Sequence, residues 1–178
     1  MLDLSKIDFS LDYSNETLAG SSTLKDGWYK LSLEEVKEET LTRSGKAKGA
    51  LFVFKVVEGL NAGQTFNRWF CTEALDSSML WSQKAFVAFL GRLQRVLQLK
   101  APESTSDFLA KPFYAYVVEK EQEYTSTEVN PETGELVKKI SKNNDFKSGK
   151  LGDVVLSCEE YADKFGKAEF SFDMSAVQ

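Results

Sequence analysis

Aromatic and basic side chains lie close to one another at several points of this sequence. Arg68 directly precedes Trp69, and Trp28 lies two residues before Lys30. Cations neutralise the phosphates of a nucleic acid, and aromatic rings stack on unpaired bases, each stack contributing about 1–3 kcal/mol. Neither contact depends strongly on which base is present. The combination therefore predicts a surface that binds a single strand without strong sequence preference.

The candidate nucleic-acid-binding residues come from several separate stretches of the chain. They are Trp28, Lys30, Arg43, Lys46, Lys48, Phe54, Lys55, Arg68, Trp69, Tyr114, Tyr116, Lys138, Lys139, Lys142 and Lys147. Some of them have a structural alternative. Phenylalanines on strands more often pack in a core, and lysines on a last strand can protect a sheet edge from aggregation.

Alternating and continuous apolar patterns predict the strands that would position these residues. Residues 28–36, 50–59 and 65–71 read as three strands joined in a meander. The second of them is apolar on both faces, so we expect it at the centre of its sheet. Two further strands are predicted over residues 111–121 and 136–142, with Tyr114 and Tyr116 on the non-core face of the first.

The hydrophobic period changes between the third and fourth predicted strands. Apolar residues recur at helical spacing over residues 77–99, which predicts an amphipathic helix of about 20 residues. Ser77 or Ser78 is expected to cap its start. Its predicted core positions are Met79, Phe86, Leu90, Leu93 and Leu97, and its polar side includes Arg92 and Arg95, to which we assign no role.

Five strands with one long helix between the third and the fourth is the element order of the OB-fold, a five-stranded Greek-key barrel. A β-sandwich with one helix is the alternative. We expect an acidic N-terminal arm over residues 1–24, the OB-fold domain over 25–150, and an acidic C-terminal extension over 151–178. In that extension, Ser157 and Glu160 have the spacing of a capping box, and Gly166 would end a short helix.

Several short motifs occur in a characteristic order between Gly27 and Lys147. They are Gly27-Trp28-Tyr29, Thr42-Arg43-Ser44-Gly45, Glu58-Gly59 with Gly63, the long helix, Leu109 to Pro112, and Asn144-Asp145-Phe146. In this order they resemble a family of small proteins from tailed phages and prophages. Members are encoded among replication and recombination genes and were long catalogued as a domain of unknown function.

The resemblance covers about two-thirds of the chain. It implies an OB-like fold, single-stranded DNA as the ligand, and a role in bacteriophage DNA replication or recombination in the cytoplasm of the host. Other phage or host replication proteins would be further partners, and self-association stays open. This chain departs from the family pattern in its longer acidic N-terminal arm and its extension beyond Gly149.

Composition argues against several other classes of protein. There is no histidine, and Cys71 and Cys158 are isolated, so histidine-based catalysis and the usual zinc sites are excluded. We therefore expect no enzyme, no metal and no cofactor. No apolar run approaches the roughly 20 residues of a membrane span. The first residues also lack the pattern of a secretory signal.

Charge is unevenly distributed along the chain. The net charge of -5 divides into -5 for residues 1–40, +4 for residues 41–150 and -4 for residues 151–178. A polyanion-binding body between acidic arms would produce this pattern. Two rivals remain: an OB-like adaptor that recruits a recombinase, helicase or host factor, and a metal-dependent nuclease using Glu34, Glu35, Glu38 and Glu39.

Overall fold

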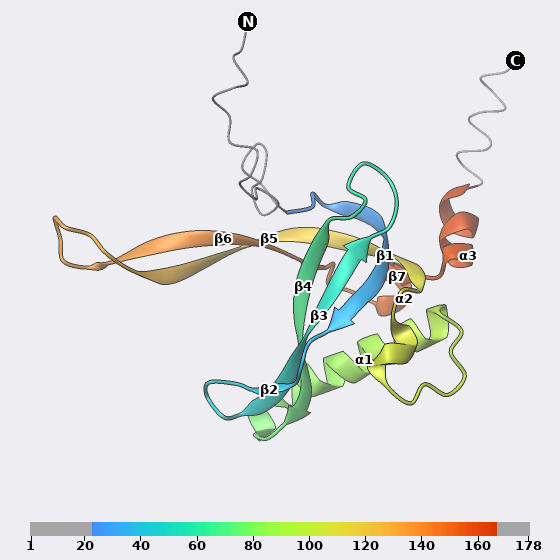
Figure 1. Cartoon of the computed structure of the whole chain (residues 1–178), viewed down its shortest axis with the longest axis horizontal. Coiled ribbons are helices and arrows are strands. Elements are labelled where there is room, and N and C mark those ends of the chain that lie inside the picture. The colour runs from blue at the N-terminus through green and yellow to red at the C-terminus, as the bar shows by residue number, and fades with distance from the viewer. Residues whose placement is uncertain (1–22, 167–178) are drawn as a thin grey trace, which may run out of the picture.

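The computed structural model describes residues 23–166, and in that range the predicted order of three strands, a long helix and two strands is confirmed (Figure 1). The described part is mainly β and forms one open antiparallel sheet of seven strands. The strands are β1 (Gly27–Val36), β2 (Thr40–Leu41), β3 (Ala47–Val56), β4 (Thr65–Ala74), β5 (Pro112–Val129), β6 (Leu136–Phe146) and β7 (Val155–Leu156). The helical segments are η3 (Ser77–Met79), α1 (Leu80–Val96), η4 (Thr105–Phe108), α2 (Leu151–Val154), α3 (Cys158–Tyr161) and η5 (Ala162–Gly166).

Strand pairing places β1 between β3 and β5. β3 also pairs with β4 and β2, which confirms its predicted central position, and β5 also pairs with β6 and β7. Within the described residues, no backbone ladder joins β4 to β6, so the sheet is open and the expected five-stranded barrel does not close. Side chains bridge part of this seam instead. Arg68 Nε lies 2.7 Å from Asp145 Oδ1, and the Phe66 and Phe146 rings lie 5.7 Å apart.

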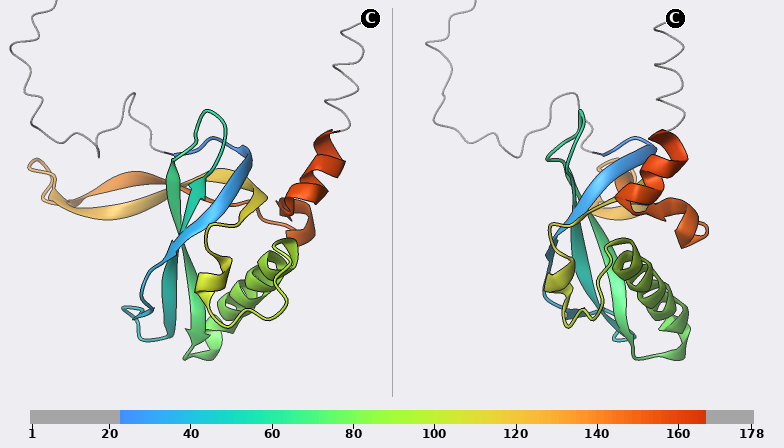
Figure 2. Two further views of the ribbon diagram at one scale, coloured as in Figure 1. Left: turned by 45° about the vertical axis from the view of Figure 1, so that its right-hand side comes forward. Right: turned by 90° about the vertical axis from the view of Figure 1, so that its right-hand side faces the viewer.

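Phenylalanine rings from the sheet and from α1 make up most of the core. Phe86, Phe89, Leu93 and Val96 are the buried residues of α1, which packs against β4 (Figure 2). Two of them, Phe86 and Leu93, were predicted core positions. The Phe89 ring lies 4.9 Å from that of Phe70 on β4. The long helix and the sheet therefore share one hydrophobic core, as the helical period predicts.

The start of the helix differs from the prediction. The cap is Asp76 rather than Ser77 or Ser78: its side chain accepts a hydrogen bond from the backbone N–H of Ser78 at the start of the 3-10 turn η3. The helix α1 then begins at Leu80. A carboxylate and a hydroxyl can each fill this position, so sequence alone does not choose between neighbouring candidates.

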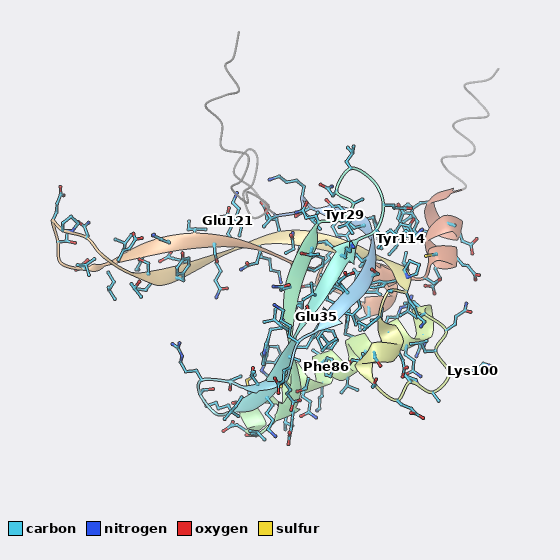
Figure 3. All side chains as sticks on the ribbon, viewed as in Figure 1. Tyr29, Glu35, Phe86, Lys100, Tyr114 and Glu121 are labelled. Carbon is cyan, nitrogen blue, oxygen red and sulfur yellow. The ribbon has the colours of Figure 1, made fainter. Side chains whose placement is uncertain are left out.

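β5 and β6 continue far beyond the body of the molecule as a two-stranded arm (Figure 1). β5 extends to Val129, eight residues beyond its predicted end, and Glu121 marks the arm in Figure 3. Tyr124, Val129, Leu136 and Ile140 are exposed there. The arm lacks the buried face by which half-buried strands are recognised in a sequence.

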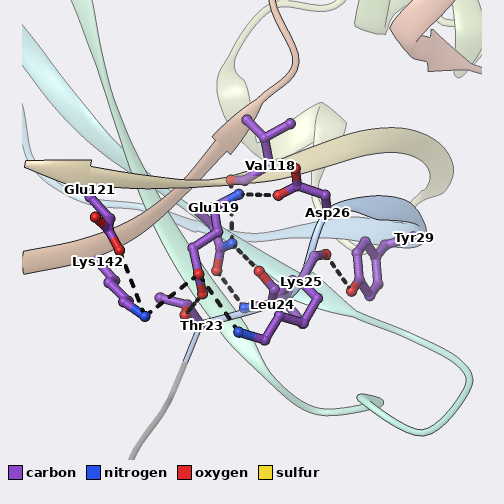
Figure 4. Close-up of polar contacts among 10 residues, drawn as sticks. Thr23, Leu24, Lys25, Asp26, Tyr29, Val118, Glu119, Glu121 and Lys142 are labelled. Atoms are coloured by element: carbon purple, nitrogen blue, oxygen red, sulfur yellow. Dashed lines mark hydrogen bonds and ion pairs between the residues drawn. The ribbon is translucent and has the colours of Figure 1, made fainter.

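Both predicted domain boundaries fall within the folded core. Leu24, assigned to the N-terminal arm, is buried, and its backbone N–H and carbonyl both bond to the side chain of Asn144 (Figure 4). Asp26 accepts a hydrogen bond from the backbone N–H of Glu119. Val154, Val155 and Leu156, assigned to the C-terminal extension, are also buried. The rest of the two expected arms, residues 1–22 and 167–178, lies outside the described residues.

Candidate nucleic-acid interface

Aromatic and basic side chains converge on a hollow of about 350 Å³ beside β1 and β5, which we call the aromatic hollow. Its lining residues are Trp28, Tyr116, Lys147, Ser148, Gly149, Lys150, Asp153, Val154 and Lys164. Three lysines and one aspartate give this lining a positive formal charge. Trp28, Tyr116 and Lys147 were all predicted site residues, and the fold brings them together.

The register of β1 and β5 explains how two of these rings meet. Trp28 pairs with Tyr116, and Lys30 pairs with Tyr114. Because side chains alternate along a strand, Phe113, Ala115 and Val117 enter the core while Tyr114 and Tyr116 turn away from it. This confirms the predicted face of the strand. The Trp28 and Tyr116 rings meet edge to face, 5.6 Å apart.

Lysine ammonium groups approach the same rings. Lys147 Nζ lies 4.8 Å from the centroid of Tyr116, and Lys164 Nζ lies 5.6 Å from that of Trp28. Within the described part of the chain, Lys147, Lys150 and Lys164 form no ion pair with a carboxylate. Their charges therefore remain available to an anionic ligand.

The C-terminal helical segment α3–η5 lies beside Tyr114 (Figure 3) and gives the hollow part of one wall through Lys164. The Tyr161 ring lies parallel to that of Tyr114 at 3.7 Å, and the Phe165 ring lies 5.5 Å from that of Trp28. The predicted capping box is confirmed, with Ser157 and Glu160 each bonding to the other's backbone N–H. In this structure Tyr161 thus covers the predicted site residue Tyr114.

Arg92 anchors this wall to α1. Its Nε donates to the Val155 carbonyl at 2.9 Å, and its Nη2 lies 2.9 Å from Glu160 Oε2. Hydrogen bonds from Ser157, followed by the Arg92 guanidinium, lower the pKa of the Glu160 carboxyl. The sequence placed Arg92 on the polar side of the helix without a role. Its side chain is in fact only 12% exposed, and it bonds to β7 and α3 through these two contacts.

Lys30 and Tyr114 share a carboxylate at the edge of the site. The Tyr114 hydroxyl donates to Glu58 Oε1 at 2.7 Å, and Lys30 Nζ lies 3.4 Å from Glu58 Oε2. Partial burial, together with this hydrogen bond, raises the pKa of Tyr114, while the same bond lowers the pKa of Glu58. The charge of Lys30 is therefore offset by its neighbour.

A second group of predicted residues, Arg68 and Trp69, lines a hollow of about 540 Å³ between β4 and the base of the arm. The Arg68 Nη1 donates to the Trp69 carbonyl at 2.6 Å. Lys120 Nζ lies 2.8 Å from Asp145 Oδ2, on the carboxylate that also binds Arg68. Glu121 also lines this hollow, so its two cations are balanced by two carboxylates.

Trp69 packs against a glycine that no other residue can replace without movement. A Cβ atom on Gly49 would lie 2.1 Å from Trp69 Cζ2 and 2.6 Å from the Phe70 carbonyl oxygen. We expect Gly49→Ala to lower the free energy of unfolding by about 1–3 kcal/mol, as overpacked sites do. It should also shift the tryptophan emission, because the indole must move. Urea denaturation followed by fluorescence measures both effects.

Gly152→Ala is the matched control, because a Cβ there meets nothing within 4 Å. It should leave stability nearly unchanged. If the two variants unfold alike, the close approach of Trp69 to β3 is wrong.

The other predicted residues are not part of either hollow. Phe54 is fully buried, so its ring belongs to the core and cannot stack on a base. Arg43, Lys46 and Lys48 lie on and beside the connection from β2 to β3, at the end of the sheet opposite α3 (Figure 1). The remaining lysines face glutamates: Lys48 with Glu73, Lys55 with Glu34, Lys138 with Glu123, Lys139 with Glu128, and Lys142 with Glu119 and Glu121.

Lys150 and Lys164 line the aromatic hollow but were not predicted. Lys164 directly precedes Phe165. It therefore fits the same rule of adjacent cation and aromatic ring that identified Arg68 and Trp69. It was missed because the whole segment was treated as an acidic extension. Lys120 was also missed. It lies near Arg68 because the pairing of β5 with β6 places it beside Asp145, the carboxylate that Arg68 contacts.

The four glutamates considered for a nuclease do not converge. Glu34 pairs with Lys55, and Glu39 accepts a hydrogen bond from Thr72. Among residues 23–166, no three Asp, Glu or Cys side chains are grouped as metal ligands would be.

Within the described segment, no helix combines the length and the apolar character needed to cross a membrane. Comparison of the chain with models of known protein families and with curated proteins finds no match.

Proposed function

We propose that this protein binds single-stranded DNA without strong sequence preference. The observation that supports the proposal is the aromatic hollow, where the rings of Trp28 and Tyr116 lie among three lysines that have no ion-pair partner within residues 23–166. Rings supply stacking surfaces for unpaired bases, and the lysines supply partners for the phosphates between them. By the family resemblance, the process served is bacteriophage DNA replication or recombination.

The acidic composition of the chain is compatible with this ligand. A charge acts on a phosphate only within about a Debye length, roughly 8–10 Å at working salt. The lining of the aromatic hollow holds Lys147, Lys150 and Lys164 against Asp153 alone. The local charge that a strand would meet is therefore positive, although the whole chain carries -5.

The strand pairing supports an OB-like arrangement as part of the proposal. β1 pairs with β3 and β5, β3 pairs with β4, and β5 pairs with β6. These pairings follow the path of an OB barrel, with the seam between β4 and β6 left open.

Titration of a fluorescent oligo-dT at two salt concentrations tests the proposal. Each phosphate contact on a single strand contributes about 0.7 to the slope of log affinity against log salt. We expect Lys147→Ala to weaken binding several-fold and to reduce that slope by about this amount. Fluorescence anisotropy gives the affinity at each salt concentration.

Lys139→Ala is the control, since Lys139 Nζ already lies 2.8 Å from Glu128 Oε1 on the arm. It should bind as the unmodified protein does. Absence of binding at low salt by the unmodified protein would reject the proposal.

An OB-like adaptor for a recombinase, helicase or host factor is the second candidate function. The projecting arm favours it, because its lysines pair with glutamates while Tyr124, Val129 and Ile140 are exposed. Exposed apolar side chains on a protruding element suit a protein partner better than a phosphate backbone.

A further inference from the structure

A groove of about 520 Å³ runs along the open seam between β4, β6 and the first half of α1. We call it the seam groove. Its floor is formed by Phe70, Phe86, Phe89 and Phe146, four rings of the shared core. The groove exists because no backbone ladder joins β4 to β6 within the described residues, so the core rings approach the surface there.

One tryptophan stands at each side of this groove. Trp69 comes from β4, and Trp81 comes from the first turn of α1. The Trp81 side chain is 71% exposed, the largest exposed aromatic area among residues 23–166. An indole left in water at the rim of an apolar groove is typical of a surface that binds a ligand.

The charges along the groove match an anionic ligand. Arg68, Lys120 and Lys147 line it, and Asp145 is the carboxylate among its lining residues. Arg68 and Lys120 both contact Asp145, at 2.7 and 2.8 Å, while Lys147 has no carboxylate partner in the described part of the chain. The lining therefore keeps a positive charge beside its aromatic rings.

The seam groove and the aromatic hollow adjoin the same short segment of the chain. Lys147, Ser148 and Gly149 line both of them. A Cβ atom added to Gly149 would meet nothing within 4 Å. A ligand can therefore approach the backbone closely at this junction. The three lining residues that they share carry one positive charge, that of Lys147, and no negative charge.

We infer that the seam groove is a second base-binding subsite, in which Trp81 stacks on a nucleobase of the same single strand that the aromatic hollow binds. This inference rests on the proposed function and extends it. The nucleobase is the occupant that both the aromatic lining and the net positive charge suit. The subsite places part of the binding surface on a helix, outside the strands and loops from which the sequence predicted it.

The test compares a short and a long oligo-dT, about 5 and about 20 nucleotides, because one OB domain holds roughly 4–16 nucleotides. We expect Trp81→Ala to weaken binding of the long oligonucleotide at least fivefold and to leave the short one unchanged. Trp81→Phe should restore part of the loss, since a smaller ring still stacks. The neighbouring variant Leu80→Ala is the control, because Leu80 is 47% exposed but does not line the groove.

Each outcome bears on a different statement. If the unmodified protein binds neither oligonucleotide at low salt, the proposed function fails and this subsite with it. If it binds both, and Trp81→Ala does so equally well, only the subsite is overturned. Equal weakening on both oligonucleotides would also overturn it, because Trp81 would then act through the fold. Binding of an acidic peptide in the groove, undisturbed by oligo-dT, would assign the groove to a protein partner instead.

Discussion

Replacement of Phe54 by alanine should lower the free energy of unfolding by about 3–5 kcal/mol, the range found for deleting a buried aromatic ring. The Phe54 ring lies within 5.0–6.2 Å of the rings of Phe66, Phe89, Phe113 and Phe146. These rings come from β4, α1, β5 and β6. The substitution would therefore remove ring contacts to four elements and leave a cavity where they meet. Urea denaturation followed by circular dichroism measures the effect.

Leu60→Ala provides the comparison, because Leu60 is fully exposed in the connection between β3 and β4. It should change stability by no more than about 0.5 kcal/mol. The slope of the unfolding free energy against urea should stay the same in both variants. A loss of less than about 1 kcal/mol for Phe54→Ala would show that its ring is not central to the core.

The second large effect is expected at Trp28, on binding rather than on stability. A base stack on an aromatic ring contributes about 1–3 kcal/mol, so Trp28→Ala should weaken oligo-dT binding by about 5- to 150-fold. The Trp28 ring also contacts Tyr116 and Phe165, at 5.6 and 5.5 Å. The variant must therefore be shown to be folded before its affinity is compared. Anisotropy titration and a denaturation curve supply the two measurements.

Two further variants separate stacking from support of the fold. Trp28→Phe keeps a ring at the same place and should retain much of the affinity. Tyr124→Ala removes an exposed ring from the arm and should have no effect, because Tyr124 lines none of the hollows around the site. Equal affinity of the Trp28→Ala and unmodified proteins would remove Trp28 from the binding surface.

Local patterns in the sequence predicted those features that depend on one element at a time. The alternation from Phe113 to Val117 predicted both faces of β5 correctly, because one face is buried and the other is not. The spacing of Ser157 and Glu160 predicted the start of α3, since a capping box is formed by residues within one turn. Phe86 and Leu93 followed from the helical period.

Features that depend on contacts between distant segments were not predictable in this way. The lysines of β6 were assigned to phosphate binding, but the register of β5 and β6 sets Lys142 beside Glu121 and Lys138 beside Glu123. That register becomes known only with the fold. Arg92 likewise acquires its carboxylate partner, Glu160, from a segment 68 residues further along the chain.

The boundaries of the folded region near the two chain ends also depend on contacts between distant segments. A polar, acidic composition suggested two arms, yet Leu24 and Val155 are buried. Trimming for binding studies should therefore remove residues 1–22 and 167–178 rather than 1–24 and 151–178. The shorter deletions keep the hydrogen bonds from Asn144 to Leu24 and the pairing of β7 with β5.

The chain contains three tryptophans, and each lines at least one of the hollows described above: Trp28 the aromatic hollow, and Trp69 and Trp81 the seam groove. Consequently the tryptophan emission of the unlabelled protein comes only from indoles that line these hollows. No tryptophan elsewhere contributes a constant background. Replacing two indoles at a time by phenylalanine would leave Trp28 as a reporter for the aromatic hollow, or Trp69 or Trp81 as a reporter for the seam groove. The order in which a ligand fills the two can then be read from stopped-flow traces.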